Sequence, residues 1–260
     1  MKPRLRHEEI LSLLHTQERV EVDELALRFD VSAETIRRDL AMLSEKGLLR
    51  KIHGGAARFQ TAQEPSFGVR SILKSTEKQY IAQCAVELIN EGDSLFIASG
   101  TTTAAFAHAL THLNELTVMT NSTIVAHELG KHPQNKHTLY LLGGIFNADE
   151  SEVMGGFLVE QVRQFRADHA VVSVGSVNAN GIFEYRMEAA ILIRAMMEHS
   201  HNLIVLADSS KLNQASLIWI SELEMVRHLV VTGTPSDELR KACEASQTML
   251  HIAGAETDPH

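Results

Sequence analysis

Four hydroxyl residues and one glycine stand together in Ser99-Gly100-Thr101-Thr102-Thr103, after an apolar run and at the start of a helical pattern. Such a segment can bind a phosphate or carboxylate, because glycine lets the backbone approach, the hydroxyls donate, and the helix N-terminus offers free N–H groups. An N-cap alone would need one hydroxyl rather than four. The segment matches neither a GxGxxG fingerprint nor a Walker loop, so nucleotide binding is not indicated. We predict an anion site formed by these five residues.

Small or polar residues also follow the other apolar runs of the chain. Each one alone is typical of an ordinary turn, and a single lysine is by default a solvated surface residue. Their recurrence at several strand ends is better explained by one shared pocket, in which Lys211 meets a phosphate or carboxylate. The further predicted pocket residues are Asn121, Ser122, Gly143, Gly144, Gly175, Glu188 and Lys211.

Two adjacent arginines, Arg37 and Arg38, suit a second kind of chemistry, contact with DNA. Arginine can bind guanine O6 and N7 or a backbone phosphate. Ser32 is a natural N-cap for the helix that carries the pair, and Ile36 and Leu40 recur on one face as its buried side. An isolated arginine pair is usually just solvated, so the interpretation depends on the elements around it.

Those elements predict a winged helix-turn-helix. Apolar periodicity predicts one helix over 4–15 and another over 22–29, and only three residues separate the second from the arginine helix, which Gly47 is expected to end. A basic strand then runs into Gly54-Gly55, as in a DNA-binding wing, where the glycines would let the backbone approach phosphates. A helical protein-interaction module is the alternative. The predicted DNA-binding residues are Ser32, Glu34, Thr35, Arg37, Arg38, Arg50, Lys51 and His53.

Charge is distributed unevenly along the 260 residues, whose net charge is −9. Residues 1–60 hold eleven Lys/Arg and ten Asp/Glu, a balance of +1, so the rest hold thirteen against twenty-three, or −10. An acidic body repels DNA, and binding must therefore use a local basic face at the N-terminal end.

Several classes of protein are disfavoured by composition. No apolar run approaches the roughly 18 residues of a membrane span, and no secretory h-region is present. Two cysteines, Cys84 and Cys243, lie far apart in helical contexts, which indicates a reduced, cytoplasmic protein without a structural disulfide. His108 and His112 have metal-ligand spacing on a helix but lack a third ligand, so we expect no metal and no other cofactor.

Beyond residue 75 the chain alternates between apolar strands and helices. Pro65 and Gly68 interrupt the preceding segment, so the predicted divisions are 1–57 (DNA-binding), 58–75 (linker), 76–252 (α/β domain) and 253–260 (frayed tail). Such alternation predicts a mostly parallel sheet covered by helices on both faces, with ligands bound beyond the carboxyl ends of its strands. The predicted strands are 94–98, 116–120, 138–142, 169–174, 203–207 and 229–232, and the predicted helices are 102–110, 123–130, 157–166 and 187–199, after one that starts near Thr76.

Residues 1–60 resemble the winged helix-turn-helix of the DeoR family of bacterial sugar-metabolism regulators, and the resemblance extends from about residue 4 to 235. The matching N-terminal residues are Val22-Asp23-Glu24-Leu25-Ala26, Val31-Ser32, Glu34-Thr35-Ile36-Arg37-Arg38-Asp39-Leu40, Leu43, Gly47-Leu48 and His53-Gly54-Gly55-Ala56. The matching C-terminal motifs are Ser99-Gly100-Thr101-Thr102-Thr103, Thr120-Asn121-Ser122, Leu142-Gly143-Gly144, Glu188-Ala189-Ala190 and Ala207-Asp208-Ser209-Ser210-Lys211.

The resemblance implies a repressor of a carbohydrate operon. It implies an effector domain similar in fold to ribose-phosphate isomerases, glucosamine-phosphate deaminases and CoA transferases. It also implies an effector that is a phosphorylated sugar or sugar acid and that weakens operator binding. Paired half-sites imply a homodimer or homotetramer on double-stranded operator DNA.

One stretch departs from the family pattern. Between Gly181 and Glu188, where family members often read Leu-Thr-Thr and an acidic residue, this chain has bulky residues that include Phe183, Tyr185 and Arg186. We expect a reshaped pocket, so the identity of the ligand is not carried over from the family.

An enzyme is the competing hypothesis: a sugar-phosphate isomerase or deaminase with a DNA-binding appendage. Such chemistry needs a positioned acid/base pair, and Glu188 and Asp208 are the candidates at element ends near the predicted pocket. Both match positions found in non-catalytic regulators, which favours the regulator.

Overall fold

The computed structural model describes residues 3–17, 19–45, 49–57 and 65–254. By their contacts the residues divide into two compact units, Met1–Lys74 and Ser75–His260, each with its own core. No helix in the described part of the chain is long and apolar enough to span a membrane.

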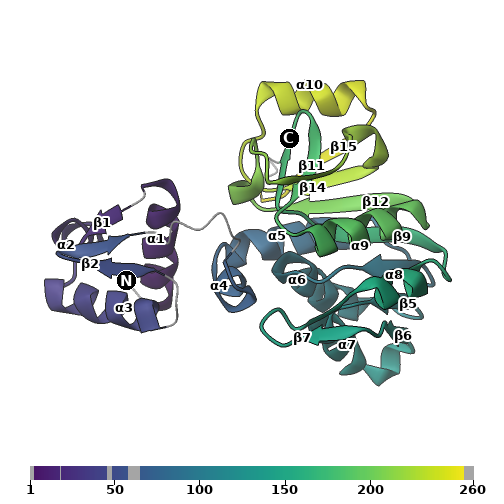
Figure 1. Ribbon diagram of the computed structural model, residues 1–260, viewed down its shortest axis with the longest axis horizontal. Coiled ribbons are helices and arrows are strands. Elements are labelled where there is room, and N and C mark those ends of the chain that lie inside the picture. The colour runs from purple at the N-terminus through teal and green to yellow at the C-terminus, as the bar shows by residue number, and fades with distance from the viewer. Residues whose placement is uncertain (1–2, 18, 46–48, 58–64, 255–260) are drawn as a thin grey trace, which may run out of the picture. The chain divides into compact units, whose positions relative to one another are not determined.

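The first unit packs three helices on a small antiparallel sheet with strand order β1-β3-β2 (Figure 1). Its core joins α1 to the helix pair through Ile10, Leu14, Leu25, Ile36 and Leu40, each at most 3% exposed. The elements are α1 (Pro3–Thr16), β1 (Arg19–Glu21), α2 (Val22–Phe29), α3 (Ala33–Glu45), β2 (Arg50–Ile52), β3 (Gly55–Ala57) and α4 (Phe67–Ile72).

A tight turn between α2 and α3 confirms the predicted helix-turn-helix. Asp30 ends α2 in a left-handed conformation with φ 51°, and the backbone N–H of Thr35 donates to Ser32 Oγ at 3.2 Å as the predicted N-cap contact. Gly47, which the sequence predicts as the end of α3, lies outside the described residues. Within the predicted linker, 58–64 also lie outside them, while 67–72 form α4.

The two glycines of the predicted wing serve the turn itself. Gly54 has φ +78°, a conformation that favours glycine, and it lies between the paired strands β2 and β3. A Cβ on Gly55 would lie 2.0 Å from the carbonyl oxygen of Val20 on β1. The close approach expected toward DNA is therefore, for Gly55, an approach to the neighbouring strand of the same unit.

The second unit is built on a seven-stranded parallel sheet, and all six predicted strands belong to it. The seventh, β15, was not predicted from the sequence. In spatial order the strands are β15 (Met249–Ile252), β14 (His228–Val231), β12 (Ser200–Ala207), β9 (Ala167–Ser173), β4 (Ser94–Ile97), β5 (Thr117–Thr120) and β6 (Thr138–Leu141).

Helices cover both faces of this sheet, as the continuous apolar strands predict. On β4, Leu95 and Ile97 pack into one core with α5, α6 and α7, while Phe96 packs into the other with α8, α9 and α10. The helix predicted over 157–166 ends earlier, at Val162, before the chain turns into β9. The helices are α5 (Ser75–Val86), α6 (Thr101–Ala109), α7 (Thr123–Gly130), α8 (Gly156–Val162), α9 (Met187–Glu198) and α10 (Asp237–Ala245).

Two small antiparallel sheets lie outside the main sheet, and neither was predicted. One has the order β10-β11-β13 and the other pairs β7 with β8. Each of these strands mixes apolar residues with polar residues or glycine, a pattern that also suits loops. Their bounds are β7 (Ile145–Asn147), β8 (Glu152–Met154), β10 (Ser176–Asn178), β11 (Gly181–Glu184) and β13 (Ile218–Ser221), and short 3-10 turns are η1 (Leu110–His112), η2 (Pro133–Asn135), η3 (Ser209–Lys211) and η4 (Leu223–Met225).

Ala253, the first residue of the predicted tail, still pairs with the main sheet. Ala253 is 8% exposed and its N–H donates to the Val231 carbonyl at 2.7 Å, so it continues the β15 pairing. Residues 255–260 of that predicted tail lie outside the described residues.

Two histidines that face each other on β14 and β15 predict that the folded protein loses stability in acid. His228 Nδ1 lies 3.0 Å from His251 Nε2. Burial, and then the charges of His251, Arg227 and His169, lower the pKa of His228 from 6.5 to about 4. The unfolded chain therefore binds a proton that the folded protein does not between these pH values, and stability should fall as pH decreases from 6.5 toward 4, by at most about 3 kcal/mol.

Urea unfolding at pH 7.5, 6 and 5 measures this loss. The profile of His228→Leu should be flatter than that of wild type, whereas His112→Gln, at an exposed histidine, should leave it unchanged. Parallel profiles for wild type and His228→Leu would contradict the assignment.

Candidate functional site

The face of α3 that is turned away from its core carries the arginine pair. The side chains of Arg37 and Arg38 are 60% and 80% exposed, and each lies near Glu34, at 3.5 Å and 3.6 Å. Exposed pairs of this kind contribute little. The two guanidinium groups can therefore leave Glu34 for phosphates or base edges at low cost.

The opposite face of α3 is anchored to α1 by a buried ion pair that sequence reasoning missed. Arg6 Nε lies 2.6 Å and His7 Nε2 lies 2.7 Å from the carboxylate of Asp39, which is 6% exposed. Burial raises the pKa of Asp39, but the hydrogen bonds from Arg6 and His7 outweigh it, so the pKa lies below its ordinary value. This cluster sets the position of α3, and with it the position of the arginines.

The other predicted DNA-binding residues divide into two groups. Lys51 and His53 are exposed on the β2–β3 hairpin, and the backbone of Arg50 lies in β2 while its side chain lies outside the described residues. Ser32 and Thr35 are tied to each other at the start of α3, with 2.9 Å between their hydroxyl oxygens. Their hydroxyls therefore already serve the helix cap.

In the second unit the sheet has one topological switch point, between β4 and β9. From β4 the chain proceeds outward through β5 and β6, and from β9 it proceeds the other way through β12, β14 and β15. The loops after β4 and β9 consequently diverge at the carboxyl edge of the sheet, the usual place for a ligand in such a fold. Ser99 to Thr103 follow β4 at this point.

The start of α6 is buried and closely packed. Thr101, Thr102 and Thr103 are 8%, 5% and 0% exposed. A Cβ on Gly100 would lie 2.2 Å from Ser173 Oγ, at the end of β9. Because Gly100 has no side chain to cap the helix, the first N–H groups of α6, which lack acceptors within the helix, are available to an anion. The hydroxyl of Thr103 is used locally, donating to the Gly100 carbonyl at 3.0 Å.

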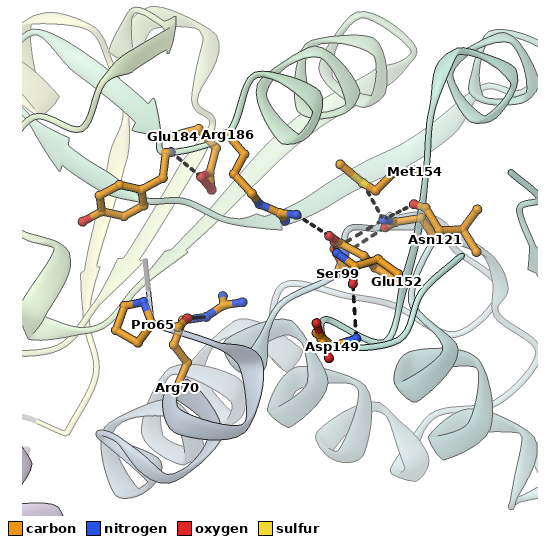
Figure 2. Close-up of polar contacts among 12 residues, drawn as sticks. Pro65, Arg70, Ser99, Asn121, Asp149, Glu152, Met154, Glu184 and Arg186 are labelled. Carbon is orange, nitrogen blue, oxygen red and sulfur yellow. Dashed lines mark hydrogen bonds and ion pairs between the residues drawn. The ribbon is translucent and has the colours of Figure 1, made fainter. Parts of the chain in front are cut away.

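A buried carboxylate lies beside this helix start (Figure 2). Glu152, at the start of β8, is 1% exposed and accepts a hydrogen bond from Ser99 Oγ and another from Arg186 Nη1, at 2.6 Å. Burial lowers the pKa of Arg186, but the hydrogen bond to Glu152 and the charges of Glu152, Glu150 and Glu184 outweigh it, so this pKa is raised. Glu152 thereby joins the loop after β4 to the segment between β11 and α9.

Asn121 and Ser122, two of the predicted ligands, support the loops around the site. Asn121 Oδ1 accepts from the Ser99 N–H at 2.9 Å, and Asn121 Nδ2 donates to the Val153 carbonyl at 3.0 Å. Ser122 Oγ caps α7 by accepting from the Val125 N–H at 3.3 Å. Both side chains are at most 1% exposed, so they position the loops through contacts within the protein.

Farther along the same edge, past the switch point, charged groups cluster after β12. Lys78 Nζ on α5 lies 4.0 Å from Asp208 Oδ2, with both side chains at most 6% exposed. Glu77 accepts hydrogen bonds from the Ser209 N–H at 3.0 Å and from Thr232 Oγ1 at 2.7 Å. Lys211, the predicted anion ligand, lies over the ring of Tyr185 with Nζ 5.2 Å from the ring centroid.

Comparison with known proteins matches both units to one family. Residues 6–62 match the DeoR-like helix-turn-helix domain, and residues 73–233 match the DeoR C terminal sensor domain. The chain belongs to the DeoR family. As a member of this family it is a DNA-binding transcriptional regulator, as the sequence resemblance implies.

Relatives align with this DeoR-family regulator over nearly its whole length. The HTH-type transcriptional repressor CsqR of Escherichia coli is 33% identical over 93% of this chain and 92% of its own. The glycerol-3-phosphate regulon repressor of Haemophilus influenzae is 34% identical over 90% and 91%, and the L-fucose operon activator of the same organism is 33% identical over 94% and 98%. Among solved structures, a D-ribose-5-phosphate isomerase in complex with phospho-erythronic acid aligns with 53% of each chain at 18% identity and a TM-score of 0.39.

The structure places the predicted pocket residues of this DeoR-family member unequally. Ser99, Gly100 and the three threonines lie together at the switch point. Gly143 is held by Gln161 through hydrogen bonds of 3.1 and 2.7 Å, while Gly144 and Glu188 are exposed. Gly175 lies in the loop between β9 and β10, where an added Cβ would lie 2.9 Å from the Tyr185 ring.

Sequence reasoning missed the charged residues that complete this edge. Glu152 and Lys78 carry no motif of their own, and Ser173 lies within an apolar strand. Arg186 was noted only as a departure from the family pattern, and that departure was the one available signal. The residues missed as part of the site are Glu77, Lys78, Glu152, Ser173 and Arg186, while Asp208 was named only as a candidate acid/base residue.

Removal of Arg38 should weaken DNA binding of this DeoR-family regulator without unfolding it. Its side chain is 80% exposed and its contact to Glu34 is long, at 3.6 Å, so Arg38→Ala should cost about 1–3 kcal/mol of specific affinity and leave thermal stability within about 0.5 kcal/mol. A gel-shift titration measures this, with Arg163→Ala at the exposed C-terminal end of α8 as the control. If the affinity of Arg38→Ala for DNA equalled that of wild type, Arg38 would not be part of the DNA interface.

Proposed function

We propose that this regulator represses a carbohydrate-metabolism operon and that a phosphorylated sugar or sugar acid controls its affinity for operator DNA. The observation that carries the proposal is the buried, uncapped start of α6 at the switch point of the sheet. It provides backbone N–H groups, the hydroxyls of Thr101 and Thr102 and a positive helix end for one anionic group. The relatives named for the glycerol-3-phosphate regulon and for the L-fucose operon support this class of ligand.

The proposed mechanism is a shift between two arrangements of the DNA-binding units. Paired modules read paired half-sites, so we propose a homodimer or homotetramer assembled through 76–252. Effector bound around Ser99–Thr103 and Lys211 changes operator affinity only if it binds the two arrangements with different affinities. We propose that it favours the arrangement that fits the operator less well.

Catalysis is not part of this proposal. Asp208 is 4% exposed, forms an ion pair with Lys78 and accepts a hydrogen bond from the Ser210 N–H. Glu188, in contrast, is exposed on α9. Neither carboxylate is arranged with the other as an acid/base pair. Turnover of a sugar phosphate by the purified protein would contradict the proposal. We also propose that the regulator acts in the cytoplasm, so a location outside the cytoplasm would contradict it as well.

The test combines ligand binding with DNA binding. Thermal-shift screening of sugar phosphates and sugar acids should find ligands that stabilise wild type, and the same ligands should change its gel-shift affinity for the promoter region next to its gene. Thr101→Ala/Lys211→Ala should lose the thermal shift and the DNA response, while Thr138→Ala, at an exposed edge position, should retain both. If every ligand stabilised the double variant as well as wild type, the proposed pocket would be wrong.

A further inference from the structure

The strand β6 forms one edge of the seven-stranded sheet (Figure 1). The N–H groups of Thr138 and Leu142 donate to backbone carbonyls of the β5 segment at 2.8 and 2.9 Å, so they point toward β5. Backbone groups point alternately to the two sides of a strand. The N–H and C=O groups of Leu139 and Leu141 therefore point away from β5, and within the described residues no strand pairs with that side of β6.

Apolar side chains border this free edge on both faces of the sheet. On one face, Tyr140 is 43% exposed, and its ring centroid lies 5.1 Å from that of Phe165, which packs on the core beneath α8. On the other face, Leu141 is 50% exposed and lies on the same side as Leu139, which packs on the core beneath α7. A strand that paired with β6 would cover apolar side chains above and below the sheet.

Phe157 on α8 and Ile145 on β7 extend this apolar surface, being 70% and 75% exposed. A Cβ added to Gly143, two residues after β6, would lie 3.9 Å from the Phe157 ring, and one added to Gly155 would lie 3.7 Å from Ile145. With the two exposed side chains of β6, these residues expose on the order of 400–500 Å². Together with the backbone of the edge, this area approaches the roughly 800 Å² per partner of a stable interface.

The free edge of β6 lacks the features that usually prevent strand pairing. Proteins whose edge strands stay unpaired place charges, prolines or bulges on them. Residues 137–148 contain no Asp, Glu, Lys or Arg, although 22% of the whole chain is charged. At the opposite edge, β15 exposes Met249 by 37%, while Leu250 and Ile252 are partly buried against the core. Of the two edges of this sheet, β6 is therefore the one suited to be covered.

A second copy of the chain supplies the strand that this edge requires. If two β6 strands meet antiparallel about a twofold axis at Tyr140, Leu139 of each copy lies opposite Leu141 of the other. Each of these opposed pairs exchanges two hydrogen bonds, so every outward backbone group of both strands is used. Residues 61–260 hold thirteen Lys/Arg against twenty-three Asp/Glu, a balance of −10, so two copies approach each other with least repulsion at an uncharged surface.

We propose that two copies of this regulator pair through β6 and join their sheets into one. The contact is isologous, so it closes with two copies and does not propagate into a fibre. Tyr140 lies on the twofold axis, opposite Tyr140 of the second copy, as a non-hydrogen-bonded pair whose side chains are close together. This inference rests on the proposed assembly through 76–252 and gives that assembly a definite contact.

Charges placed at Tyr140 test both the contact and its symmetry. Tyr140→Glu should weaken self-association about 100-fold or more and halve the mass measured by light scattering, because two like charges would face each other across the axis. Tyr140→Lys should do the same. An equimolar mixture of the two variants should recover the wild-type mass, because unlike charges then face each other. Met249→Glu, on the opposite edge strand, is the matched control and should keep the wild-type mass.

A backbone substitution checks the pairing without adding charge. Leu141→Pro removes an N–H that points to the free edge and leaves the hydrogen bonds to β5 in place, since proline is tolerated on the open side of an edge strand. It should also halve the mass. Thermal melts of each variant show that it is folded, and recovery in the mixture of the two Tyr140 variants shows the same independently.

The possible failures are distinct. If wild type is monomeric, both the β6 contact and the proposed paired assembly are wrong. If wild type is oligomeric and both Tyr140 variants keep its mass, or if their mixture does not recover it, the β6 contact is wrong and the assembly uses another surface. Thermal stabilisation by inorganic phosphate, measured on the same samples, tests the effector site separately: its absence in wild type would contradict that site, while the masses still decide the β6 contact.

Discussion

Alanine at Asp39 should unfold the DNA-binding unit while the second unit stays folded. Asp39 accepts from Arg6 at 2.6 and 3.2 Å and faces His7 at 2.7 Å, and the side chain of Arg6 is 6% exposed. Removal of one partner of a buried ion pair is strongly destabilising, by about 3–5 kcal/mol. A domain of about 60 residues has little stability beyond that amount, so specific DNA binding should be lost with the fold.

Hydrogen exchange measured by mass spectrometry resolves the two units. In Asp39→Ala, amides in 3–57 should exchange rapidly while those in β4, β9 and β12 keep wild-type protection. Glu34→Ala is the control, since Glu34 is an exposed carboxylate on the same helix. Wild-type protection of α3 in Asp39→Ala would show that the buried pair does not hold α3 to α1.

The first unit was predictable because its signals are local. Ser32 marks the start of α3 and Ile36 marks its buried face, and Gly54-Gly55 indicates a turn because glycine adopts a positive φ without steric cost. The contact between Arg6 and Asp39 was not predictable, because it joins residues 33 positions apart and a charged residue in a helix is by default solvated. Its burial depends on how α1 packs on α3, which periodicity does not specify.

The second unit shows the same division between local and distant information. The predicted strands of the parallel sheet were found from their apolar runs, whereas in β15 (Met249–Ile252) a histidine interrupts the run. The loop after β4 was predicted from its own residues. Glu152 reaches that loop from 53 positions away, and nothing near Glu152 marks it as buried. Motifs therefore indicated the proposed anion site, and only the fold showed which charged residues surround it.

Gly100 should be the least replaceable residue of the effector site. Its φ of +157° favours glycine, and an added Cβ would lie 2.2 Å from Ser173 Oγ and 3.2 Å from Thr103 Oγ1. Overpacking costs about 1–3 kcal/mol and an unfavourable φ costs a similar amount. Gly100→Ala should therefore destabilise the second unit by about 2–5 kcal/mol and abolish its stabilisation by inorganic phosphate, because the first N–H groups of α6 would be displaced.

A second substitution, at Ser173 on β9, separates the cost of overpacking at Gly100 from the cost of its unfavourable φ. Ser173→Ala removes the oxygen at 2.2 Å and leaves Ser173 Cβ at 3.5 Å, an ordinary contact. Urea unfolding of Gly100→Ala/Ser173→Ala should therefore recover about 1–3 kcal/mol relative to Gly100→Ala, while the strain from φ remains. Gly156→Ala is the control, since its added Cβ meets nothing within 4 Å. If Gly100→Ala had the same free energy of unfolding and the same affinity for phosphate as Gly156→Ala, the prediction would be wrong. The close packing of the β4 and β9 loops would then have no part in binding the effector.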